Sequence, residues 1–379
     1  MSNTMKENKM GTMPVNKLLI NMALPMMISM LVQALYNIVD SIFVARISEE
    51  ALTAVSMAFP MQNLMIGVAG GVGVGTNALL SRALGEGRHE EADKMAVQGI
   101  FITACSYIIF LAIGLFFARE FFVIQGANEV IADYGYDYLS VILIVSFGCL
   151  FQMIFERLLQ ATGRTFYSMI TQGTGAIINI ILDPILIFGL FGAPRLGAVG
   201  VAIATASSRA IELIGCFIVS VFSKDVKLNL TYIFIRSKVL LKDFIRLSLP
   251  ALGNDVSWSV GFAMYSVILG HLSTDVVAAN SLVTVVRNIG SVFCFAIASA
   301  GTILLGNIMG KGDLEKSKEY ASRMLKMTVI AGAVGGLIVL AVTPFVLHFA
   351  SLSENAMHYL KIMLLINTYY IMGSAVNTA

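Results

Sequence analysis

The chain has 379 residues, of which 57% are hydrophobic and only 13% are charged, and its formal net charge at pH 7 is +2. Soluble domains carry about 25% charged residues, so the composition excludes an ordinary soluble protein and indicates a membrane protein. A net charge this small, without a basic cluster that contains aromatic residues, also excludes a nucleic-acid-binding protein. The cysteines are widely spaced within apolar stretches, and no paired cysteines or histidines suggest a metal site. No resident cofactor or metal is therefore expected.

Ten apolar stretches long enough to cross a bilayer as helices follow one another along the chain. They lie at residues 17–44, 54–80, 95–118, 134–157, 165–191, 197–221, 242–270, 279–306, 324–348 and 357–379. The polar residues 1–16 contain no signal-peptide cleavage pattern, so the first stretch is expected to remain in the membrane. The sequence therefore predicts an all-α polytopic membrane protein with ten spans.

Basic residues gather on one side of these spans. If the N-terminus is cytoplasmic, the inner segments hold 19 Lys and Arg residues and the outer segments hold 4, with Arg209 and Arg287 inside spans. Because an excess of Lys and Arg marks the cytoplasmic side of a membrane protein, we expect a cytoplasmic N-terminal tail, residues 1–16, in the plasma membrane. The longest hydrophilic segment, residues 223–241, is then a cytoplasmic linker.

The chain also repeats itself when it is shifted by 225 residues. MALPMMISMLVQ from Met22 aligns with LSLPALGNDVSW from Leu247, and LLSRALGEGRHEEADKMA aligns with LLGNIMGKGDLEKSKEYA. Two halves that repeat in the same direction, six spans apart, indicate two bundles related by a pseudo-two-fold axis along the membrane normal. Secondary transporters are built on this plan.

The second half shows four spans where the first shows six. YLSVILIVSF from Tyr138 and YLKIMLLINT from Tyr359 each open the fourth span of their half. We therefore expect two pseudo-symmetric bundles of six transmembrane helices with the second incomplete. Residues 17–222 are the N-terminal six-helix lobe, and residues 242–379 are four helices of the C-terminal lobe. The sequence would then be a C-terminally truncated part of a twelve-span protein.

Acidic and amide side chains inside the spans predict a cation site, because an ionisable residue near the centre of a membrane helix costs about 2.5–3.5 kcal/mol on insertion scales. Asp40 shares a helical face with Tyr36 and Asn37 on the first span. Asn179 and Asp183 are four residues apart and share a face of the fifth span. Because alternate spans run in opposite directions, the two carboxylates are expected at similar depth, near the outer side.

Pro184 adds a further oxygen to this group, because a proline removes the helical hydrogen bond to the carbonyl four residues earlier, that of Ile180. Carboxylate, amide and carbonyl oxygens suit a hard cation such as Na⁺. A pair of buried carboxyls could equally hold a proton. A purely structural alternative is a hydrogen-bonded acid pair that joins two helices.

Other polar residues within the spans are candidates for cation or substrate binding. They are Tyr36, Asn37, Glu156, Thr205, Asp255 and Arg287. Alternatively, Glu156 pairs with Arg157 at headgroup level and Asp255 makes a helix contact on the cytoplasmic side. Arg287 could face a water-filled cavity.

Two further pairs have a predicted structural role. Arg209 and Glu212 are three residues apart on the sixth span, a spacing that predicts an internal salt bridge. Pro25 and Pro250 are equivalent under the repeat, and proline-containing spans are common hinge points. We expect bending at Pro25 to respond to cation binding at Asp40.

Five segments in order along the chain resemble the multidrug and toxic compound extrusion (MATE) family. They are ALPMMISMLVQALYNIVDSIFVARI, LLSRALGEGRHEEA, QATGRTFYSM, NIILDPILIFG and GAVGVAIATASS. The resemblance covers roughly residues 17–379. It implies secondary active export of cationic or amphipathic organic compounds, driven by inward Na⁺ or H⁺ movement. It also implies functional acids at Asp40 and Asp183.

Two alternatives follow from the same residues. A lipid-linked precursor flippase of the same superfamily is expected to have more basic residues around its cavity, whereas these spans carry acids at least as often as bases. A seven-span receptor lacks a six-span repeat, and no cluster resembles a membrane hydrolase site, so an enzyme is not expected. The expected partners are small molecules and the bilayer, with the protein a monomer.

Overall fold

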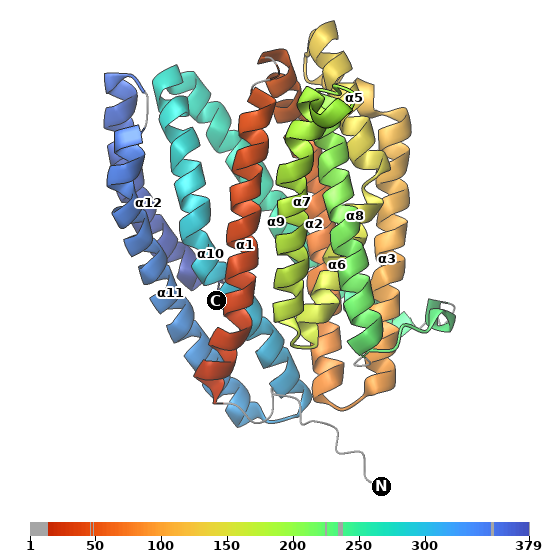
Figure 1. Cartoon of the computed structure of the whole chain (residues 1–379). Helices are drawn as coiled ribbons and strands as arrows, with labels where there is room; N and C mark the ends of the chain where they lie inside the picture. The colour runs from red at the N-terminus through yellow and green to blue at the C-terminus, as the bar shows by residue number, and fades with distance from the viewer. Residues whose placement is uncertain are drawn as a thin grey trace. The chain divides into compact units, whose positions relative to one another are not determined.

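The computed structural model describes residues 14–45, 47, 49–223, 226–233, 238–349 and 352–378. Within them the chain consists of helices joined by turns and short connections, without a strand (Figure 1). The long helices are α1 (Val15–Ala45), α2 (Glu49–Gly85), α3 (His89–Phe116), α5 (Glu129–Ile144), α6 (Phe147–Ala161), α7 (Thr165–Phe188), α8 (Ala198–Ser223), α9 (Lys238–Leu272), α10 (Thr274–Gly310), α11 (Leu314–Phe349) and α12 (Glu354–Thr378). A short helix, α4 (Ala118–Ile124), and two 3-10 turns, η2 (Leu190–Gly192) and η3 (Leu230–Ile233), complete the set. Most of the predicted N-terminal tail and part of the predicted linker lie outside the described residues.

Seven helices of the described chain are long and apolar enough to cross a membrane. The helices α5 and α6 form an eighth span if they are counted together, although they are bent by 43° at a short break. The predicted all-α membrane architecture is therefore confirmed. The predicted spans at 242–270 and 357–379 are helical but are not among the seven, so the number ten stays a prediction.

By its contacts the chain divides into two compact units. The larger unit contains Leu35–Ser257, and the smaller unit contains the described residues up to Ala34 and from Trp258 onward. The first part of α1 therefore belongs to the smaller unit, and the first part of α9 belongs to the larger unit. The predicted lobes, residues 17–222 and 242–379, keep most of α1 in the first lobe and most of α9 in the second. The contact units instead assign the first part of each helix to the other unit.

Apolar packing accounts for this exchange. In the smaller unit, Leu19, Met22 and Met26 of α1 are buried against α10 residues such as Ala300. In the larger unit, the first part of α9 lies against α2 at Gly71, where a Cβ atom would come within 3.1 Å of the Leu252 Cβ atom. Small residues of this kind allow membrane helices to approach closely. The predicted hinge residues are each inside an exchanged segment, Pro25 in α1 and Pro250 in α9.

Candidate functional site

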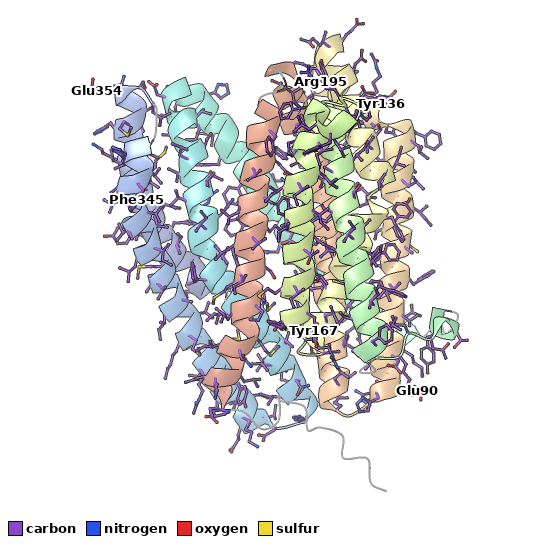
Figure 2. The ribbon with its side chains drawn as sticks, in the orientation of Figure 1. Glu90, Tyr136, Tyr167, Arg195, Phe345 and Glu354 are labelled. Carbon is purple, nitrogen blue, oxygen red and sulfur yellow. The ribbon has the colours of Figure 1, made fainter. Side chains whose placement is uncertain are left out.

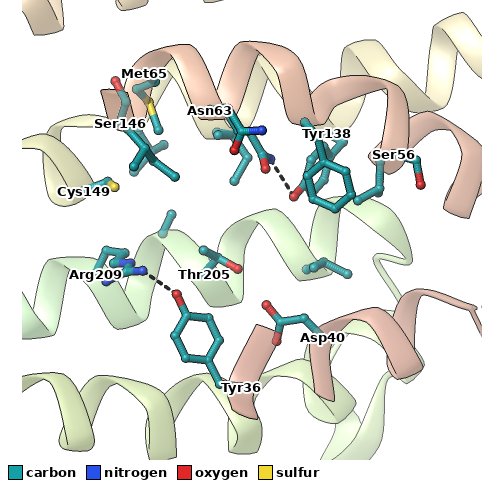
Figure 3. A pocket seen from close by; sticks show the side chains of 18 residues that line it. Tyr36, Asp40, Ser56, Asn63, Met65, Tyr138, Ser146, Cys149, Thr205 and Arg209 are labelled. Carbon is teal, nitrogen blue, oxygen red and sulfur yellow. Dashed lines mark hydrogen bonds between the residues drawn. The ribbon is translucent and has the colours of Figure 1, made fainter. Parts of the chain in front are cut away.

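A cavity of about 360 Å³ lies within the larger unit (Figure 3). Its lining comes from α1, α2, α5, α6 and α8 and is mostly apolar. The lining residues are Tyr36, Asp40, Val55, Ser56, Phe59, Gln62, Asn63, Met65, Ile66, Tyr138, Ile142, Val145, Ser146, Cys149, Val201, Thr205, Ala206 and Arg209. One carboxylate, Asp40, and one guanidinium, Arg209, thus line the same cavity, among hydroxyl and amide groups.

The break between α5 and α6 contributes directly to this wall. Val145 and Ser146, in the connection between the two helices, and Cys149, in the first turn of α6, all line the cavity. The sequence predicts one continuous span at residues 134–157. The structure replaces it with two helices whose junction lies at the cavity.

The three residues predicted to bind a cation are brought together beside this cavity. Asp183 and Asn179 on α7 are 0% and 1% exposed. The carboxyl groups of Asp40 and Asp183 interact directly with each other. The side-chain oxygen and nitrogen of Asn179 have no hydrogen-bond partner in the protein. The same holds for both carboxyl oxygens of Asp183 and for Oδ1 of Asp40. The cluster is therefore rich in buried oxygens that no protein donor satisfies.

Such an arrangement needs a positive charge. A buried polar group without a partner costs about 1–3 kcal/mol, and a charged group costs more. Two carboxylates side by side also repel each other, so they require a proton or a cation between them. The helix α7 continues through Pro184, and because a proline has no N–H, the carbonyl of Ile180 one turn earlier lacks its usual helical donor. The oxygens of this group match the preference of a hard cation.

A second charged group borders the cavity. Arg209 donates from Nη1 to Oε2 of Glu212 at 3.0 Å and from Nη2 to the hydroxyl of Tyr36. The side chains of Arg209 and Glu212 are 12% and 3% exposed, so this is a buried ion pair. The predicted salt bridge between them is confirmed. Tyr36 joins this pair to the helix that carries Asp40.

The remaining predicted residues are placed apart from one another. Thr205 on α8 lines the cavity. Asp255 on α9 lies against Gly70 of α2 and does not line the cavity. Arg287 belongs to the smaller unit, where its guanidinium lies 4.6 Å and 5.8 Å from the ring centroids of Phe262 and Tyr370. The side chain of Asn37 is outside the described residues.

Glu156 also lies outside the cavity lining. Its carboxylate is hydrogen-bonded to the side chains of Gln152, Gln160, Ser168 and Gln172. The guanidinium of Arg157 donates to Oε1 of Gln160 at 2.9 Å. The pairing that the sequence suggested between Glu156 and Arg157 is thus replaced by a polar cluster between α6 and α7.

Several lining residues were not predicted as site residues. Gln62 on α2 lines the cavity and donates to the hydroxyl of Tyr138 at 2.8 Å (Figure 3). Ser56 and Asn63 line it from the same helix. Ser56, Phe59 and Asn63 are spaced three and four residues apart, and this spacing in the sequence already indicates that they share one face of a helix. The partner Tyr138 is 76 residues away along the chain, a distance at which sequence spacing carries no information.

Known proteins resemble the chain over most of its length. The family model described as MatE matches residues 25–185 and 250–379. The chain is 26% identical over 317 residues to a FAD transporter of Shewanella oneidensis, covering 84% of this chain and 70% of that protein. It is 26% identical over 302 residues to the probable multidrug resistance protein NorM of Thermotoga maritima, covering 79% of this chain and 65% of that protein. A crystal structure of MATE in complex with MaL6 has a TM-score of 0.88 at 26% identity, covering 98% of this chain and 85% of that chain.

Proposed function

Because the chain belongs to the MatE family of membrane transporters, we propose that it is a secondary active exporter of cationic or amphipathic organic compounds. It exchanges them for Na⁺ or H⁺ by alternating access. The observation that carries this proposal is the cluster of Asp40, Asn179 and Asp183, whose buried oxygens lack protein donors. The proposed orientation has the N-terminus in the cytoplasm and the protein in the plasma membrane.

Asp40 links ion binding to substrate binding, since it belongs both to the carboxyl pair and to the cavity wall. It lines the cavity and its carboxyl also contacts that of Asp183. A cation or proton at the pair neutralises Asp40 and removes a negative charge from the cavity wall. Without it, the same carboxylate attracts a cationic substrate. The two ligands therefore compete for one charge, which is the requirement for exchange.

The cavity supports an amphipathic substrate. Its volume of about 360 Å³ falls within the range of small-molecule sites, about 300–1,000 Å³. Phe59, Met65 and Ile66 provide apolar surface, and Met adapts to varied shapes. The relatives are named for FAD and for multidrug resistance, and none of those named here supports the flippase alternative.

The test is dye efflux from cells or vesicles that contain the full chain, under Na⁺ and pH gradients imposed separately. Asp40→Asn and Asp183→Asn should each reduce gradient-driven efflux to background, because either change removes a carboxylate from the pair. Asp255→Asn is the matched control, since that carboxylate lies outside the cavity lining. Full efflux in both of the first two variants would exclude the proposed site.

The predicted hinge can be tested in the same assay. Pro25→Ala should slow efflux because it stiffens α1, while cation binding measured on the purified protein should stay unchanged. Pro250→Ala is the equivalent change in α9. Unchanged efflux in both variants would remove the hinge from the mechanism.

A further inference from the structure

One face of α7 is polar or small along most of its length. Ser168, Gln172, Gly175, Asn179 and Asp183 recur at spacings of three or four residues and so share a face. Figure 2 shows Tyr167, in the first turn of α7, and Arg195, which follows α7, far apart along the larger unit. Gln172 and Asp183 lie about 16 Å apart along the helix axis. The pair of Asp40 and Asp183 therefore occupies only one end of this face.

The other end meets the carboxylate of Glu156 on α6. Its Oε1 accepts from Nε2 of Gln160 at 2.7 Å and from Oγ of Ser168 at 3.1 Å. Its Oε2 accepts from Nε2 of Gln152 at 3.0 Å and of Gln172 at 2.7 Å. Gln152, Gln160 and Ser168 are at most 3% exposed. Four uncharged donors thus surround a single carboxylate.

Two buried amide oxygens in this cluster have no hydrogen-bond partner, Oε1 of Gln152 and Oε1 of Gln172. Each belongs to an amide whose nitrogen donates to Glu156, so its oxygen points away from the carboxylate. Half a turn of either amide would exchange its nitrogen and oxygen. The oxygens would then face the carboxylate, which is favourable only with a cation between them.

The charges nearby also favour a cation. The hydrogen bonds to Glu156 come from neutral groups, so they do not cancel its charge. The guanidinium of Arg209 on α8 does not neutralise it, because Arg209 is paired with Glu212 at 3.0 Å. The carboxyl of Glu212 packs against Gly175 on the same face of α7. The guanidinium of Arg157 reaches Glu156 only through Gln160, so no cation touches this carboxylate directly among the described residues. A carboxylate within the spanning helices is costly without one.

We propose that Glu156 is the centre of a second alkali-cation site, selective for a hard cation such as Na⁺. The ligands are the Glu156 carboxylate, the amide oxygens of Gln152 and Gln172 after rotation, and the hydroxyl oxygen of Ser168. A single carboxylate among neutral oxygens suits a monovalent ion better than Ca²⁺, whose sites gather several carboxylates. Its role as a second station for the coupling ion rests on the proposed function, whereas binding itself does not.

Gln160 separates this proposal from a purely structural role of the cluster. Its Nε2 donates to Glu156, as those of Gln152 and Gln172 do, but its Oε1 already accepts from Arg157 at 2.9 Å. Gln160 is therefore a donor in the cation-free state and not a ligand. Its loss should leave Na⁺ affinity unchanged or raise it, because only the cation-free state is weakened.

The test measures Na⁺ binding to the purified full chain by titration calorimetry, with choline chloride keeping ionic strength constant. Asp183→Asn removes the first site, and this variant should still bind Na⁺. In that background, Gln152→Met and Gln172→Met should each weaken binding at least about tenfold, the effect expected even of groups around metal ligands. Glu156→Gln should abolish it, and Gln160→Met should not weaken it.

Two results would overturn the proposal. One is an Asp183→Asn protein that folds and binds no Na⁺. The other is an equal loss of binding in all three Gln→Met variants, which indicates a structural clamp. A Na⁺-dependent rise in melting temperature, measured for each variant, separates lost binding from lost folding. If Asp183→Asn binds Na⁺ but the unmodified chain exports no dye, the proposed function fails while the second site stands.

Discussion

The two units carry different chemistry at equivalent positions of the repeat. Under the shift of 225 residues, Gln62 in α2 corresponds to Arg287 in α10, and Asp40 corresponds to Tyr265. In the larger unit Gln62 hydrogen-bonds to Tyr138 at the cavity. In the smaller unit the guanidinium of Arg287 lies over two aromatic rings. The repeated helices thus carry an aspartate, Asp40, in the larger unit and an arginine packed on aromatic rings, Arg287, in the smaller unit.

This difference bears on where the proposed cation coupling resides. The larger unit contains buried oxygens without donors, at Asp40, Asn179 and Asp183. In the smaller unit, α9 has Tyr265 in place of the acid, and the positive charge of Arg287 on α10 belongs to the protein itself. A repeat that preserves helix packing therefore does not preserve the site, and substitutions should affect the two units differently.

The largest effect on stability is expected for Arg209→Met in the larger unit. It leaves Glu212 as a buried charge without its partner, which costs about 3–5 kcal/mol. Arg119→Met is the matched control, because its ion pair with Asp133 is exposed, with side chains 49% and 68% accessible, and such pairs contribute about 0–1 kcal/mol. Thermal unfolding in detergent measures both, and equal losses would contradict a buried pair.

A smaller effect is expected for Arg287→Gln, which converts the smaller unit to the amide that the larger unit has. The guanidinium loses its contacts with Phe262 and Tyr370, and a partly desolvated cation–π contact contributes about 1–2 kcal/mol. The melting temperature should fall, whereas Na⁺ binding at Asp183 should not change. A change in Na⁺ affinity would show that cation binding is not confined to the larger unit.

The smallest effect is expected for Gln62→Leu. It removes one neutral hydrogen bond, to Tyr138, which contributes about 1 kcal/mol. Because Gln62 lines the cavity, the apparent dye affinity in the efflux assay should change while the melting temperature changes little. Tyr138→Phe removes the same bond from the other side and should reproduce the result. An effect of Gln62→Leu alone would assign the role to substrate contact instead of the bond.

The sequence was informative where one helix contains the whole signal. Position inside apolar spans singled out Asp40 and Asp183, whose carboxyls interact in the structure, and spacing within one turn predicted the Arg209–Glu212 pair. Contacts between helices could not be predicted in this way, because they depend on tertiary packing. The bond from Arg209 to Tyr36 joins residues 173 apart. The break between α5 and α6 could not be predicted either, because the junction contains no proline.

The polar face of α7 has an electrical consequence. Gln172 and Asp183 are separated by about 16 Å along the helix axis, roughly half of a hydrocarbon core about 30 Å thick. Moving a unit charge across the whole membrane potential requires about 2.3 kcal/mol per 100 mV. If both proposed sites bind the coupling ion, its passage from the pair at Asp183 to the cluster at Glu156 crosses about half of the membrane potential. This step should then depend on voltage even when the two sites bind the ion equally well.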